Sequence, residues 1–83
     1  MATTETMAVI ADRFYAVIDK LIEMQVLRGV ATFTTKYGID RRNFLRTRAT
    51  HSINVVWLMI VARDYNVSTD YLLLGVGGMF REA

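Results

Sequence analysis

The stretch FTTKYGIDRRNF, residues 33–44, places a helix end and a helix start within a few positions of each other. In and just before this stretch, apolar residues recur at spacings of three and four, at Val30, Phe33 and Tyr37. Gly38 is the residue best able to adopt the left-handed conformation that ends a helix. Asp40 can accept a hydrogen bond from a free N–H group of a following helix. The stretch predicts a helix of about eight residues, a short turn and a second helix over residues 41–49.

The second predicted helix carries four of the ten basic residues of the chain. The net charge is only +2, yet the basic residues gather in one segment, at Lys36, Arg41, Arg42, Arg46 and Arg48. With about 100° per residue, Arg41, Arg42 and Arg46 fall on one side of this helix and Phe44 falls on the other. Arginines on such a helix can read guanine in a major groove, and Leu45 and Ala49 can contact thymine methyl groups. The alternative is an ordinary solvated helix face.

One long helix is predicted before this segment. Apolar residues repeat at spacings of three and four over residues 8–26, and charged residues fall between them. We expect an amphipathic helix over this range and a flexible segment over residues 1–7.

Two further helices are predicted after it. The run at residues 55–61 is apolar and rich in β-branched residues, so a buried strand is the alternative to a helix there. No second β segment offers a partner, which favours a helix that is capped by Ser52 and ends before Asn66. Ser68 is the expected cap of a short fifth helix that includes residues 71–74.

The expected core contains the large apolar residues that face inward in these helices. They are Phe14, Ile18, Leu21, Phe33, Ile39, Phe44, Val56, Trp57, Ile60, Val67, Leu72 and Leu73. Residues 8–75 would form the folded domain, and residues 76–83 a glycine-rich apolar tail. Met79 and Phe80 on this tail are expected to pack back or to contact another chain.

The composition excludes several classes of site. The 83 residues include no cysteine and one histidine, which excludes disulfides, thiolate zinc sites and multi-histidine metal sites. No catalytic constellation or nucleotide-binding glycine pattern is found, so no enzyme activity, cofactor or small-molecule substrate is expected. The longest apolar run is about half of what a membrane-spanning helix needs, so no membrane partner is expected. Without a signal peptide pattern, the expected location is cytoplasmic.

Residues 33–44 resemble the helix-turn-helix core of lambda-repressor-like DNA-binding domains, the family of phage repressors and xenobiotic-response-element regulators. Residues 60–75 resemble the fourth and fifth helices of that family, and the glycine-rich residues 74–80 are similar to the end of its phage repressor domains. The resemblance implies a compact all-α, five-helix fold with a helix-turn-helix formed by the second and third helices. It also implies double-stranded DNA binding and transcription regulation by a phage-type or mobile-element repressor that acts as a homodimer.

The resemblance further implies roles for individual residues. The expected base contacts come from Arg41, Arg42, Leu45 and Arg46. The expected phosphate contacts come from Arg28, Lys36, Asn43, Arg48 and Thr50. Val30 stands where the family often has glutamine at the start of the second helix, so one common DNA contact is missing.

A second function is compatible with the same residues. The helical scaffold could serve as a protein-interaction module, adaptor-like or antitoxin-like, that does not bind DNA. Salt dependence discriminates the two functions, because contacts to several phosphates weaken steeply with salt and apolar contacts do not.

Overall fold

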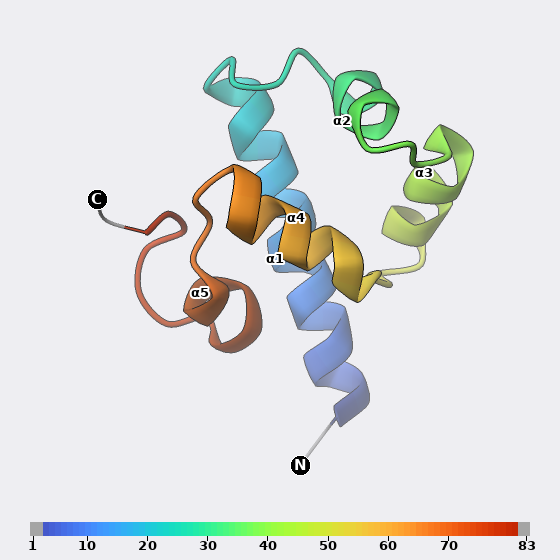
Figure 1. Cartoon of the computed structure of the whole chain (residues 1–83). Helices are drawn as coiled ribbons and strands as arrows, with labels where there is room; N and C mark the ends of the chain where they lie inside the picture. The colour runs from blue at the N-terminus through green and yellow to red at the C-terminus, as the bar shows by residue number, and fades with distance from the viewer. Residues whose placement is uncertain (1–2, 82–83) are drawn as a thin grey trace.

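The computed structural model describes residues 3–81, with side chains from residue 7 onward, and within that range the chain folds into five α-helices (Figure 1). They are α1 (Thr3–Glu23), α2 (Val30–Lys36), α3 (Arg41–Ala49), α4 (Val55–Asp64) and α5 (Thr69–Leu74). The described residues contain no β-strand beyond an isolated antiparallel bridge between Val67 and Phe80. The predicted all-helical fold is confirmed, and the strand alternative at residues 55–61 is wrong.

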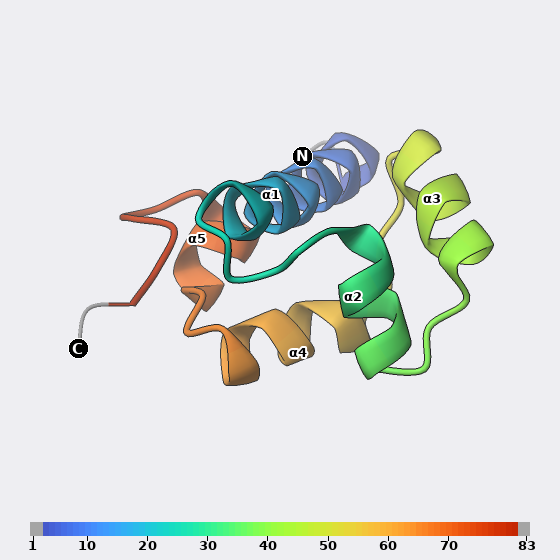
Figure 2. The same cartoon turned by 90° about the horizontal axis from the view of Figure 1, so that it is seen from above.

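The helices surround one core. In Figure 2, α1 lies above α4, with α2 and α3 at one end of the molecule and α5 at the other. The Cα radius of gyration is 12.3 Å, close to the value of about 12 Å expected for one domain of this length. Within residues 3–81, no helix has the length and apolar character needed to cross a membrane.

The turn between α2 and α3 forms as its residues predict. Gly38 has a φ of 66°, which lies in the left-handed region that glycine adopts most readily. Asp40 caps α3, because its carboxylate accepts a hydrogen bond from the backbone N–H of Arg42 at 3.1 Å. Ser68 caps α5 in the same way, through the backbone N–H of Tyr71 at 3.2 Å. The caps predicted at these two starts are confirmed.

Two predicted helix starts are wrong. Helix α1 begins at Thr3 instead of residue 8, so the segment expected to be flexible is helical from Thr3 onward, and residues 1–2 lie outside the described range. No glycine or proline stands between Thr3 and residue 8 to stop the helix. Helix α4 is capped by Asn54, whose side chain accepts from the backbone N–H of Val56 at 2.9 Å. Ser52 does not cap it, because its hydroxyl is engaged in the turn after α3, 3.0 Å from the Thr50 hydroxyl and 3.4 Å from the Thr50 carbonyl.

Aromatic side chains dominate the core. Phe14 of α1 lies at its centre, with its ring centroid 6.2 Å from those of Phe44 and Trp57. The Phe33 and Phe44 centroids are 5.9 Å apart. These rings come from four helices, so each of α1, α2, α3 and α4 is fixed by the same cluster.

Three residues of the expected core are not fully buried. Val56 and Leu73 are exposed, and Ile39 is half-buried. The inward face of α4 is formed by Trp57, Leu58, Ile60 and Val61, and the helical period then turns Val56 outward. Further core residues that the prediction omitted are Ala11, Tyr15, Val17, Leu27, Leu58 and Val61.

The tail packs back on the domain. The carbonyl of Met79 accepts from the N–H of Ser68 at 2.9 Å, and the N–H of Arg81 bonds the carbonyl of Asn66 at 2.9 Å. Met79 and Phe80 are half-buried against the core. Of the two possibilities for these residues, packing back on the same chain is the one observed.

Candidate nucleic-acid interface

Helix α3 is fixed to the core by one aromatic residue. Phe44 has no exposed surface, and its ring packs 5.2 Å from that of Trp57 and 5.6 Å from that of Tyr15. Because Phe44 points inward, the residues on the opposite side of α3 point to solvent. Leu45 is 43% exposed there.

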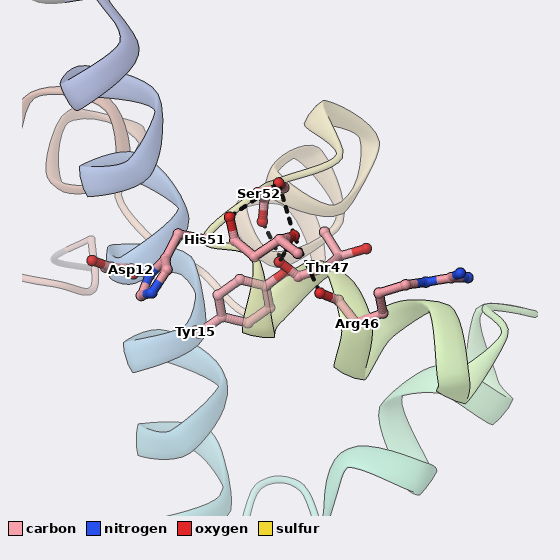
Figure 3. A network of polar contacts seen from close by, with 7 residues as sticks. Asp12, Tyr15, Arg46, Thr47, His51 and Ser52 are labelled. Atoms are coloured by element: carbon pink, nitrogen blue, oxygen red, sulfur yellow. Dashed lines mark hydrogen bonds and ion pairs between the residues drawn. The ribbon is translucent and has the colours of Figure 1, made fainter.

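Three arginines form the exposed side of α3. Arg41, Arg42 and Arg46 are all exposed, and among residues 7–81 none of them takes part in an ion pair. Arg46 makes one long hydrogen bond, from Nη2 to the Asn43 side-chain oxygen at 3.5 Å. In Figure 3, the Arg46 side chain extends away from α1. We call these three residues the basic face. In the described part of the chain, none of its guanidiniums is paired with a carboxylate, and the one adjacent acid, Asp40, bonds the backbone of α3, so the basic face attracts anions.

Arg48 occupies a different position from the basic face. Its guanidinium donates two hydrogen bonds to the Asp19 carboxylate of α1, at 3.0 and 2.6 Å. It also lies 5.5 Å from the centroid of the Tyr15 ring. The bonds to Asp19 raise the pKa of Arg48. Burial raises the pKa of Tyr15 to about 12, although the nearby charge of Arg48 opposes this shift. The predicted phosphate ligand Arg48 is therefore already paired with a carboxylate.

The turn after α3 is held against α1 by polar contacts (Figure 3). The Tyr15 hydroxyl donates to the carbonyl of Ser52 at 3.0 Å. His51 Nδ1 lies 2.8 Å from Asp12 Oδ1. The Thr50 hydroxyl lies 3.1 Å from the carbonyl of Thr47 and 3.0 Å from the Ser52 hydroxyl. The Thr50 hydroxyl, which was expected to bind phosphate, is thus engaged within the turn.

Polar contacts also join the C-terminal ends of α2 and α4. The Tyr37 hydroxyl donates to Asp64 at 2.7 Å, and the adjacent Arg63 donates two bonds to the same carboxylate at 2.7 and 2.9 Å. The hydrogen bonds from Arg63 and, to a smaller extent, from Tyr37 hold the pKa of Asp64 below its ordinary value. Burial raises the pKa of Tyr37, and the hydrogen bond to Asp64 raises it further. Lys36 Nζ lies over the Tyr37 and Tyr65 rings, 5.5 and 5.7 Å from their centroids.

The structure places the predicted DNA-contact residues in three groups. Arg41, Arg42, Leu45 and Arg46 share the outer side of α3, with Asn43 exposed beside Arg46. Lys36 lies at the end of α2, and Arg28 is exposed in the loop that precedes α2, so the two stand at opposite ends of that helix. Arg48 and Thr50 lie at the end of α3 and make contacts within the chain.

Sequence reasoning missed the α1 residues that hold the end of α3. These are Asp12, Tyr15 and Asp19. Their spacing of three and four puts them on one side of α1. That spacing was the only available signal, because their partners are 29 to 39 positions away in the sequence.

No cluster of three or more potential metal ligands occurs among the described residues. No match was found for this chain among protein-family models, curated proteins or solved structures.

Proposed function

We propose that this protein binds double-stranded DNA sequence-specifically and regulates transcription, as a phage-type or mobile-element repressor does. In this proposal α2 and α3 form a lambda-repressor-like helix-turn-helix, α3 enters the major groove, and the protein has no catalytic activity. The observation that carries the proposal is the basic face, in which three exposed arginines without acidic partners project from a helix anchored by Phe44.

The dimensions of α3 fit this function. The helix has nine residues and is about 13 Å long, enough for its arginines to reach a few adjacent base pairs in a major groove about 12 Å wide. Guanidinium groups can each donate two hydrogen bonds to a guanine, and Leu45 can contact a thymine methyl group.

Within this proposal the residues divide by role. Arg41, Arg42, Leu45 and Arg46 contact base edges. The residues proposed for phosphate contacts are Arg28, Lys36, Asn43, Arg48 and Thr50. Arg48 and Thr50 would first have to exchange their present partners.

We further propose that two copies bind DNA together, because two half-sites about 34 Å apart give specificity that one helix lacks. The tail was the expected contact, but Met79 and Phe80 pack on their own domain. The apolar groove between α4 and α5 is the better candidate. It has a volume of about 410 Å³ and is lined by residues that include Val55, Met59 and Leu73. Val55, Met59 and Leu73 are 72%, 47% and 46% exposed, and such a contiguous apolar patch is typical of an interaction site.

The charge of the basic face can be tested with a matched pair of variants. Arg42→Gln removes a positive charge from α3, and Lys20→Gln removes one from an exposed position on α1. Binding to a random duplex pool is measured by fluorescence anisotropy at several salt concentrations. We expect Arg42→Gln to weaken binding of the best-bound duplexes by about 1–3 kcal/mol, because one base contact is lost. Lys20→Gln is expected to bind as the wild type does. Equal behaviour of the two variants would contradict the assignment of the basic face.

A protein-interaction module remains the second candidate, and the exposed α4–α5 groove is the observation that favours it. This function predicts association that barely changes with salt, because apolar contacts involve no release of counterions.

A further inference from the structure

The C-terminal end of α3 is held by one side of α1. Asp12, Tyr15 and Asp19 of α1 contact His51, Ser52 and Arg48 respectively. The two ends of α3 therefore differ electrostatically. The guanidiniums of the basic face form no ion pair with the residues that the structure describes, whereas Arg48 at the end of the helix is paired with an acid from another helix.

The geometry of the Arg48–Asp19 pair makes it strong for a surface contact. Nη1 donates to Oδ1 at 3.0 Å and Nη2 donates to Oδ2 at 2.6 Å. Arginine uses the same planar paired arrangement for phosphate. A phosphate that binds Arg48 in the same paired way, through Nη1 and Nη2, would displace Asp19. Asp19 and a phosphate are thus competitors for one group.

The pair is nevertheless accessible. The Arg48 and Asp19 side chains are 37% and 55% exposed, and ion pairs at such exposure are weak enough to exchange partners. Arg48 lies in the chain only two positions beyond Arg46 of the basic face. A nucleic acid seated on α3 would bring its phosphates toward this end of the helix.

We propose that Asp19 limits the DNA affinity of this protein by competing with a backbone phosphate for Arg48. This inference rests on the proposed DNA binding. Asp19 is then an affinity-determining residue outside the DNA-contacting helix, and Arg48 is a phosphate contact that becomes fully available only when the Asp19 charge is removed.

The sign and the size of the effect follow from counterion release. Freeing Arg48 adds about one phosphate contact, which steepens the salt slope by about 0.9. This contribution vanishes at about 1 M salt. Relative to that concentration, one added contact raises the affinity about fifteenfold at about 50 mM and about fourfold at about 200 mM.

Asp19→Asn tests the proposal, with Glu23→Gln as the matched control. Both changes remove one negative charge from α1, and both remove a carboxylate that accepts a hydrogen bond from a basic side chain. Glu23, however, pairs with Lys20 on the same helix, at 3.2 Å, and does not contact α3. Binding of a random duplex pool is measured by anisotropy from about 50 to about 200 mM salt. We expect Asp19→Asn to bind more tightly with a steeper slope, and Glu23→Gln to stay within about twofold of the wild type because its charge is distant and screened.

Arg48→Ala completes a double-mutant cycle. If the gain passes through Arg48, then Asp19→Asn has no effect on DNA affinity in the Arg48→Ala background. A gain that persists there would overturn the proposal, as would an Asp19→Asn variant that binds like Glu23→Gln or more weakly than the wild type. Thermal unfolding of each variant verifies that it is folded. Failure of the wild type to bind any duplex is a separate outcome that contradicts the proposed function itself.

Discussion

At the scale of single residues, Phe44 and Leu45 are neighbours on α3 with different roles. Phe44 has a structural role, and Leu45 has a proposed functional one. Phe44 is completely buried, while Leu45 is 43% exposed. Phe44 packs against aromatic rings from α1, α2 and α4. Leu45 lies beside the basic face, so its side chain is available to a partner. The two residues are adjacent, apolar and similar in size, which makes them a natural pair for comparison.

We predict opposite consequences for alanine at these two positions. Phe44→Ala is expected to lower the free energy of unfolding by about 3–5 kcal/mol, because it removes a ring from the core and leaves a cavity. Leu45→Ala is expected to change it by less than about 0.5 kcal/mol and to weaken DNA binding. Urea denaturation measures the first effect, and anisotropy measures the second. Comparable losses of stability in both variants would be inconsistent with the described orientation of α3.

At the scale of the elements, a glycine lies near each end of α2, and the two glycines differ in backbone conformation. Gly38 has a φ of 66°, in the left-handed region, whereas Gly29 has a φ of 175° and is extended. A Cβ atom at either position would meet no atom within 4 Å. The two positions therefore differ in backbone conformation and not in steric room.

Alanine substitution separates these two cases. Gly38→Ala is expected to destabilise the protein by about 1–2 kcal/mol, because an L-residue is strained in the left-handed conformation. Gly29→Ala should be neutral or slightly stabilising, because alanine reduces the freedom of the unfolded chain. Thermal unfolding of both variants checks this. A larger loss of stability from Gly29→Ala than from Gly38→Ala would contradict the left-handed conformation of Gly38 in the turn before α3.

Local chemistry explains which helix boundaries could be predicted. Asp40 and Ser68 cap their helices through bonds that span two or three residues, so the sequence nearby contained all the information. At the start of α4 the sequence offered two cap residues, Ser52 and Asn54, and the bond from Val56 to Asn54 is also local. The two differ in that Ser52 belongs to the turn held by the Tyr15 hydroxyl, which is 37 positions away. Contacts of that range are not visible in a local pattern.

At the scale of the whole molecule, the same distinction applies to the candidate interface. Periodicity was sufficient to predict that Arg41, Arg42 and Arg46 share the exposed side of α3. It could not predict that Arg48 pairs with Asp19, since this depends on how α1 packs against α3. Likewise, the partial exposure of Val56 and Leu73 depends on which side of α4 and α5 faces the core.

The exposed apolar groove gives a prediction about assembly. Met59 lines the α4–α5 groove, while Met24 follows α1, and their exposures of 47% and 49% are closely matched. We expect the wild type to dimerise in sedimentation equilibrium, Met59→Glu to be monomeric and Met24→Glu to dimerise normally, because a charge in an apolar interface is costly to desolvate. A wild type that stays monomeric on DNA as well as in solution would contradict the proposed dimer.

The central claim is that the basic face of α3 contacts the bases of duplex DNA while cationic residues around it contact the phosphates. The most direct measurement is the affinity of the wild-type protein for a random duplex pool, by fluorescence anisotropy, at about 50 and about 200 mM salt. Two to three cationic phosphate contacts, from Arg28, Lys36 and Arg48, predict an affinity loss of about tenfold to fortyfold between these concentrations. Absence of binding at both concentrations, or binding that salt leaves unchanged, would contradict the claim.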